Sequence, residues 1–141
     1  MTEPQMQSVF NTRTAAGFAP VGISGAEVGG VAMYDALFEK KNVGSFVAKG
    51  KIPIADYQAE FEAQKKAGRH LAYIDGYELG SKAVVSAIWY SSLGANYAAL
   101  HGQTKAQIGT AETQNLAVGR LARGITEYKD GGVLRYAGLW R

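Results

Sequence analysis

A repeat with a period of 51 residues constrains the fold of this chain more than any other feature. The segment "GAEVGGVAMYDALF" at residues 25–38 returns as "GYELGSKAVVSAIW" at residues 76–89. A looser third copy, "EYKDGGVLRYAGLW", follows at residues 127–140, again 51 positions later. Because glycines and large aromatic residues stay in register without a gap, the pattern indicates a structural duplication with one supersecondary unit per period.

Several positions keep their chemical character in all three copies. These positions are Gly17, Gly68 and Gly119; Ile23, Ile74 and Ile125; Gly29, Gly80 and Gly131; and Phe38, Trp89 and Trp140. A repeated glycine in a turn predicts a positive φ angle, which glycine adopts at little cost. A repeated large aromatic residue predicts a side chain that fills the space between one hairpin and the next helix, with a burial worth about 2–3 kcal/mol.

Each period predicts a helix followed by a β-hairpin. In "IPIADYQAEFEAQKKAG", apolar side chains recur at three- and four-residue steps, at Ile54, Tyr57 and Phe61. Pro53 precedes this stretch and Gly68 follows it, as at the start and end of a helix. A short β-like run, a glycine-bearing turn and a longer strand come next, the pattern of a hairpin. The segments "VGSFVAKG" and "GANYAALHG" between the units predict a further strand each.

The expected fold is therefore α+β, with three helix–hairpin units at about residues 4–41, 54–92 and 105–141 in a single repeat domain over residues 1–141. One such unit cannot bury its apolar face alone, so neighbouring copies must stack and share a core.

The two faces of the second strand in each unit are expected to differ. One face carries Tyr34, Ala36 and Phe38 and their equivalents, and its small central residue predicts close packing against a helix. The other face carries Met33, Asp35 and Leu37, with Val84, Ser86 and Ile88 and with Arg135, Ala137 and Leu139 in the later units. This mixed composition predicts a partly solvated face, where any binding groove is expected.

Composition excludes several classes of function. The chain has 15 basic and 12 acidic residues, a net charge of +3, and no cysteine. Scattered basic residues argue against a nucleic-acid-binding stripe, and thiol chemistry and disulfides are excluded. No run approaches the roughly eighteen apolar residues of a membrane span. The N-terminus "MTEPQMQSVFNTR" does not look like a signal peptide, so we expect either a cytosolic protein or a chain that starts after a removed leader.

The sequence contains no recognisable catalytic or metal site. No GxSxG, P-loop, GxGxxG or HExxH motif occurs. His70 and His101 occupy non-equivalent places in the repeat and are interpreted as structural. Glu27 and Glu78 are equivalent turn residues and are interpreted as solvating the turns rather than as paired acid and base. We expect no catalytic residue, no metal and no cofactor.

The candidate ligand-binding residues are Tyr77, Tyr128, Tyr90 and Arg135. Tyr77 and Tyr128 hold equivalent turn positions, which favours a repeated exposed contact of the kind that a sugar-binding platform uses. Core packing is the alternative interpretation for the three tyrosines, and the sequence leaves it open.

The stretches at residues 57–61, 68–89 and 136–140 resemble the bacterial tandem repeat family, whose repeats of about fifty residues also occur in the N-terminal region of fungal polyglycine hydrolases. The resemblance implies a curved, half-barrel-like antiparallel sheet with helices packed on one side. It also implies secretion and a supporting or target-binding role, and it carries no catalytic residue over to this chain.

The sequence thus favours a non-enzymatic repeat domain for structural support or for binding a protein or glycan target. A small-ligand-binding protein that uses the concave face of the sheet is the alternative, and a hydrolase without a recognisable motif is the second alternative. An open stack leaves terminal faces, and the last strand, "VLRYAGLWR", has little polar cover. We therefore expect that its edge could pair with another copy in a homo-oligomer.

Overall fold

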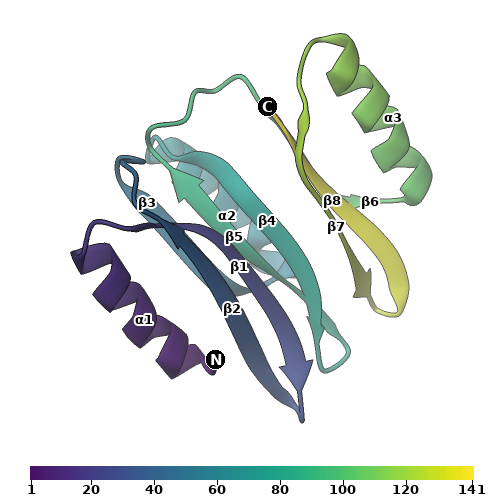
Figure 1. The fold of residues 1–141 in the computed structure, drawn as a ribbon. Coiled ribbons are helices and arrows are strands. Elements are labelled where there is room, and N and C mark those ends of the chain that lie inside the picture. Colours follow the sequence, from purple (N-terminus) through teal and green to yellow (C-terminus); the bar gives the residue numbers. More distant parts are fainter.

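The computed structural model describes residues 1–141 and contains three helices and eight strands (Figure 1). Their bounds are α1 Glu3–Ala15, β1 Ala19–Val28, β2 Val31–Glu39, β3 Phe46–Pro53, α2 Ile54–Lys66, β4 His70–Leu79, β5 Lys82–Tyr90, β6 Ala98–Gln103, α3 Lys105–Ala117, β7 Ala122–Asp130 and β8 Val133–Trp140. Unit 1 comprises α1, β1 and β2. Units 2 and 3 each begin with one more strand, β3 and β6, as predicted from the segments between the hairpins.

All strand pairs are antiparallel, and the strands divide into three sheets that do not close into a barrel. The orders are β1-β2, β3-β5-β4 and β6-β8-β7. The predicted α+β class and the three units are confirmed. The prediction of a free edge on the last strand is wrong, because β8 lies between β6 and β7 and has a hydrogen-bonded neighbour on each side. Among the second strands of the three hairpins, only β2 has a single hydrogen-bonded neighbour.

The three helices end in the same way, at the repeated glycines. Gly17, Gly68 and Gly119 have φ angles of +83°, +80° and +80°. The amide of the next residue then reaches back to a carbonyl in the last turn: in unit 2, Arg69 N–H donates to the Gln64 carbonyl at 2.9 Å. This Schellman ending turns the chain from helix into strand and requires a left-handed residue.

Replacing Gly68 by alanine is expected to destabilise the protein by about 1 kcal/mol, because the Cβ of alanine is strained in the left-handed conformation. Gly109, inside α3, offers the matched control. A Cβ there meets nothing within 4 Å and its φ is not positive, so Gly109→Ala should stabilise by up to about 1 kcal/mol. Urea unfolding of both variants measures the two effects, and effects of the same sign would contradict the assignment.

The repeated aromatic residue packs against its own unit's helix or core in each copy. The Phe38 ring lies 4.9 Å from the Phe10 ring of α1. Trp89 is fully buried in a cluster that includes Tyr57 of α2. Trp140 is fully buried with Ile108 of α3, and its indole N–H donates to a Glu112 carboxylate oxygen. The predicted packing of this position on a helix is confirmed, but the prediction that it is the next unit's helix is wrong, because each hairpin packs against the helix that precedes it in the same unit.

The core is continuous from unit to unit, and this overturns one prediction. The second-strand face that was expected to be partly solvated is buried in units 2 and 3: Val84, Ser86 and Ile88 are at most 4% exposed, and Ala137 and Leu139 are fully buried. The physical reason is that each unit turns this face toward the preceding unit, so that Ile23 packs with Val84 and Ile88. Only unit 1 leaves it open, where Leu37 is 69% exposed.

Candidate functional site

Tyr77 and Tyr128 lie at equivalent positions in two successive inter-unit interfaces. Their exposed fractions are 8% and 3%, so of the two interpretations that the sequence left open, core packing applies to both. A Cβ built on Gly25 would lie 2.5 Å from the Tyr77 ring, and one built on Gly76 would lie 2.8 Å from the Tyr128 ring. Each ring therefore packs against a glycine of the preceding unit, where only a residue without a side chain leaves room.

The two tyrosine hydroxyls bond to the backbone of the first strand of their own unit, β3 or β6. The Tyr77 hydroxyl donates to the Gly50 carbonyl at 2.7 Å, and the Tyr128 hydroxyl accepts from the Gly102 amide at 2.8 Å. Burial raises the pKa of both phenols above the usual value. Both side chains are thus structural links between units, and neither offers a free face to a sugar.

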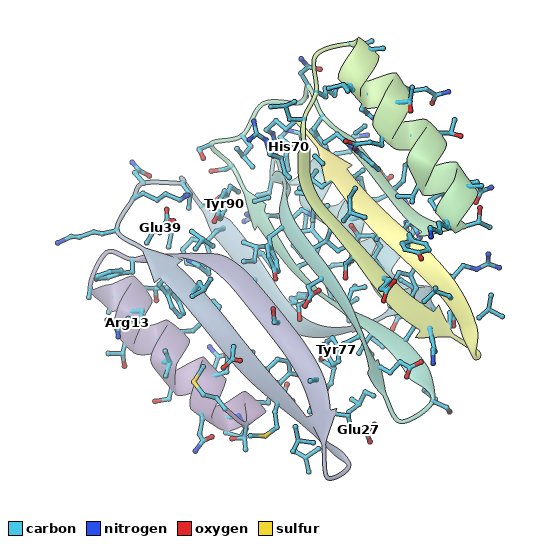
Figure 2. All side chains as sticks on the ribbon, turned by 45° about the vertical axis from the view of Figure 1, so that its right-hand side comes forward. Arg13, Glu27, Glu39, His70, Tyr77 and Tyr90 are labelled. Carbon is cyan, nitrogen blue, oxygen red and sulfur yellow. The ribbon has the colours of Figure 1, made fainter.

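Tyr90 and Arg135 do not complete a common site with them. Tyr90 is 6% exposed, and its hydroxyl donates to the Pro20 carbonyl of unit 1. Tyr77 and Tyr90 lie toward opposite ends of the strands of unit 2 (Figure 2). Arg135 is half-buried and faces Tyr128 across the β7–β8 pair. The structure therefore does not bring the four candidate residues together.

Polar side chains also join the hairpins of neighbouring units. Between units 2 and 3, the Thr126 hydroxyl donates to Asp75 at 3.0 Å and accepts from the Gly76 amide at 2.9 Å. Between units 1 and 2, a Glu27 carboxylate oxygen accepts from the Gly80 amide at 3.1 Å. Glu27, labelled in Figure 2, thus accepts a hydrogen bond from a turn of the next unit. These contacts hold the hairpins in register.

His70 belongs to a cluster that ties the end of unit 3 to unit 2. Its Nδ1 lies 3.2 Å from the Tyr97 hydroxyl, and the Arg141 guanidinium lies 5.1 Å from the centre of the Tyr97 ring. Arg141 also donates to the Leu71 carbonyl at 3.1 Å. The arrangement is a structural histidine site, and no three His, Asp or Glu side chains come together as metal ligands anywhere in the chain.

His101 makes the stability of the domain dependent on pH. Its ring packs edge-on against Tyr57 at 5.0 Å, and burial lowers its pKa. The unfolded chain then binds the proton more readily, so stability is full above about pH 6.5 and falls as the pH drops below that value. Urea midpoints should decrease between pH 7 and 5, and less so for His101→Gln. Equal slopes for the two proteins would contradict this prediction.

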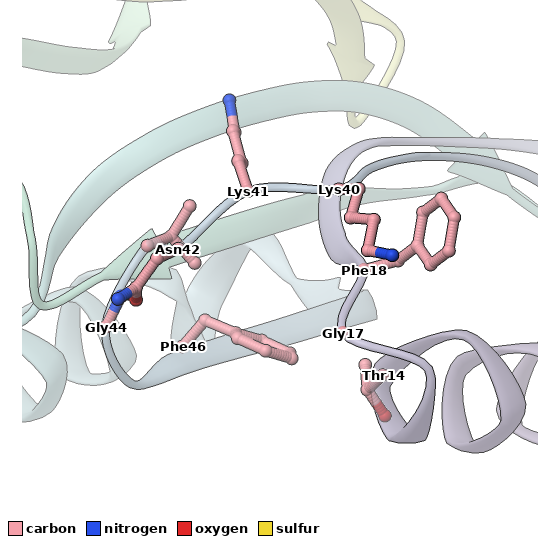
Figure 3. Close-up of a pocket in the computed structure, with 9 residues that line it drawn as sticks. Thr14, Gly17, Phe18, Lys40, Lys41, Asn42, Gly44 and Phe46 are labelled. Carbon is pink, nitrogen blue, oxygen red and sulfur yellow. The ribbon is translucent and has the colours of Figure 1, made fainter.

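A depression of about 450 Å³ is open to solvent and lies between the end of α1 and the loop after β2 (Figure 3). Three of its nine lining residues are hydrophobic. Lys41 is one of the lining residues, and its Nζ pairs with a Glu39 carboxylate oxygen at 3.2 Å. Separately, none of the helices combines the length and apolar character needed to cross a membrane.

Exposed apolar side chains gather on the hairpins of the two end units. In unit 1 they are Val28, Val31 and Leu37, 62%, 53% and 69% exposed; in unit 3 they are Ile125, Val133 and Leu134, 48%, 51% and 43% exposed. Ile23 and Ile74, the equivalents of Ile125, are at most 4% exposed. Sequence reasoning missed these surfaces, although the repeat register contains the signal: an interface position in an end unit has no neighbour to cover it.

Comparison with known families agrees with this division into units. A family model described as "Polyglycine hydrolase-like, structural repeat" matches three times, at residues 1–41, 44–92 and 94–141. The second and third matches include β3 and β6, so these strands belong to the repeat. No curated protein matches the chain. Because the matches span almost all of its length, the protein belongs to the family of polyglycine hydrolase-like structural repeats.

Proposed function

We propose that this domain is a non-catalytic scaffold whose stacked units hold a fixed shape and bind a protein target through the outward faces of the end units. The observation that carries the proposal is the exposure of Ile125 and Leu134 at positions that are buried in unit 2. Exposed apolar surface rimmed by polar residues is typical of interaction sites. In the register of β7 and β8, Glu127 lies between Ile125 and Leu134, and Lys129 pairs with Leu134.

A protein target is favoured over a glycan or a small ligand. A sugar-binding platform needs exposed aromatic side chains. Tyr77, Tyr90 and Tyr128 are instead buried in the packing between units. The depression between the end of α1 and the loop after β2 is open to solvent, and a small-molecule site usually encloses most of its ligand. Membership of a structural repeat family also supports a scaffold role.

A double variant, Ile125→Ser with Leu134→Ser, tests the proposed surface. Both residues are exposed, so each change should alter stability by no more than about 0.5 kcal/mol. Peptide ligands selected from a displayed library on the wild-type domain should lose binding to this variant. They should keep binding to Val118→Ser, which removes a 67% exposed apolar residue beyond the end of α3.

Two outcomes would contradict the proposal. One is a set of selected ligands that bind the double variant as well as the wild type. The other is covalent labelling by a serine-directed fluorophosphonate, which would show an activated nucleophile and a catalytic function.

A further inference from the structure

A depression of about 210 Å³ lies between α2 of unit 2 and β6 of unit 3. The residues that line it include Tyr57, Gln58, Phe61, Glu62, Leu100 and His101. Drug-sized ligands occupy pockets of about 300–1,000 Å³. This depression therefore has room for a smaller group, such as one long side chain.

The same depression occurs one period earlier, between α1 and β3, with a volume of about 220 Å³. Its helix residues lie 51 positions before those of α2 and are Met6, Gln7, Phe10 and Asn11. The depression is thus a feature of the repeated interface. The earlier copy has no acidic, basic or histidine side chain in its lining, whereas the later copy has Glu62 and His101.

The helix side of the later depression presents hydrogen-bond acceptors. The Gln58 side-chain amide donates to Glu62 Oε1 at 3.0 Å, as Gln7 donates to Asn11 in unit 1. The other carboxylate oxygen of Glu62 has no partner within the chain. None of the three ion pairs in the domain involves Glu62, and Lys66, one helical turn away, is not bonded to it. Glu62 is exposed, so its carboxylate is available to a ligand.

The strand side adds His101, whose ring packs edge-on against Tyr57 at 5.0 Å. Burial lowers the pKa of His101, so the ring is neutral at pH 7 and one of its nitrogens is an acceptor. The ring makes no hydrogen bond within the chain. Tyr57 is 3% exposed, and its hydroxyl has no hydrogen-bond partner either. Because a buried polar group without a partner is costly, these two side chains favour a ligand that supplies the missing bonds.

The groups without partners define the chemistry of the ligand. They include hydrogen-bond acceptors and one negative charge, so the complement is a cation with several N–H donors. A guanidinium carries five N–H donors in a planar fork and binds a carboxylate through two of them. The Phe61 ring and Leu100, which is 38% exposed, offer apolar contact to the methylene groups of an arginine side chain.

We propose that the depression between α2 and β6 binds the guanidinium group of an arginine side chain of a partner protein, with Glu62 as its ion-pair partner and His101 as a hydrogen-bond acceptor. The choice of a protein as the source of the arginine rests on the proposed function. The site is separate from Ile125 and Leu134, so the two proposals can fail independently.

The direct test is an NMR titration of the ¹⁵N-labelled domain at pH 7 with a capped Gly-Arg-Gly peptide. The backbone amides of Glu62 and His101 should shift, whereas those of Met6 and Asn11, in the earlier depression, should not. A peptide with citrulline, the neutral isostere of arginine, should bind at least about tenfold more weakly, because the charged bond to Glu62 is lost. Free L-arginine is the third probe and should bind no more tightly than the peptide.

Two variants of α2 provide the matched pair. Glu62 and Asp56 are both exposed, and Asp56 does not line the depression. Glu62→Gln and Asp56→Asn each remove one negative charge, and each should change the thermal midpoint little. Glu62→Gln should weaken binding of the arginine peptide at least about tenfold, and Asp56→Asn should leave it unchanged.

Four results would overturn the inference. They are the absence of shifts at Glu62 and His101 up to high millimolar peptide, equal binding of the arginine and citrulline peptides, equal losses in the two variants, and tighter binding of free arginine than of the peptide, which would make a small molecule the ligand. If the peptide fails while ligands selected on the Ile125 face still bind, the scaffold proposal stands and this inference falls.

Discussion

Replacing Trp89 by alanine is expected to destabilise the domain by about 3–5 kcal/mol, the range for removal of a buried tryptophan. Trp89 is fully buried in the cluster that joins units 2 and 3. A domain of this size has a total stability of about 5–15 kcal/mol, so the variant should unfold at far lower urea or lose its cooperative transition. Far-ultraviolet circular dichroism during urea unfolding measures the effect, and a loss below about 1 kcal/mol would contradict the burial of Trp89.

A pair of phenylalanine variants separates packing from hydrogen bonding at this position. The buried Trp89 indole N–H has no partner, whereas the Trp140 indole N–H donates to Glu112. Trp89→Phe removes an unsatisfied donor, which offsets part of the lost packing. Trp140→Phe removes a bond to a carboxylate, so we expect it to cost about 1–2 kcal/mol more than Trp89→Phe. The reverse order would contradict the assignment.

Replacing Gly76 by alanine is expected to destabilise the domain by about 1–3 kcal/mol, the usual cost of overpacking. The new methyl group would lie 2.8 Å from the Tyr128 ring, which is buried and held by the Gly102 amide. Gly25→Ala should behave in the same way, because its methyl group would lie 2.5 Å from the Tyr77 ring. Thermal unfolding of both variants measures these effects.

The equivalent residue of unit 3 is the control. Glu127 is exposed and has no tyrosine over it, so Glu127→Ala should change stability by no more than about 0.5 kcal/mol. A loss at Glu127 as large as that at Gly76 would show that the cost does not come from the tyrosine contact.

The repeat register predicts much of the fold from the sequence alone. The glycines that end the helices, the hairpin turns and the position of Phe38, Trp89 and Trp140 all follow from local rules applied three times. The structure confirms them because these features depend mainly on contacts within one unit.

Predictions that depend on how units meet were less successful. A tyrosine has an apolar ring and a polar hydroxyl, so its sequence position did not show that Tyr77 and Tyr128 are buried. The burial is indicated by a glycine in the preceding unit, Gly25 for Tyr77 and Gly76 for Tyr128. Unit 1 has Ala26 in place of the tyrosine and unit 3 has Glu127 in place of the glycine. The tyrosine thus occurs only where a unit precedes, and the glycine only where a unit follows.

The candidate surfaces follow from the same principle. An interface position in an end unit has no partner within the chain, which explains why Leu37 and Ile125 are exposed while Ile88 and Ile74 are buried. Composition cannot distinguish these residues, since the same residue types occupy covered and uncovered positions. The sequence also did not show which hairpin strand has an open edge. The strand order shows that β2 has one neighbouring strand, whereas β8 has two.

The central claim is that one interface is used twice along the chain. A ¹³C-edited NOESY spectrum tests it most directly, through cross-peaks between tyrosine ring protons and glycine α protons. We predict cross-peaks from Tyr77 to Gly25 and from Tyr128 to Gly76, two contacts separated by one period. A spectrum that shows one of these contacts without the other, or neither, would contradict the repeated interface.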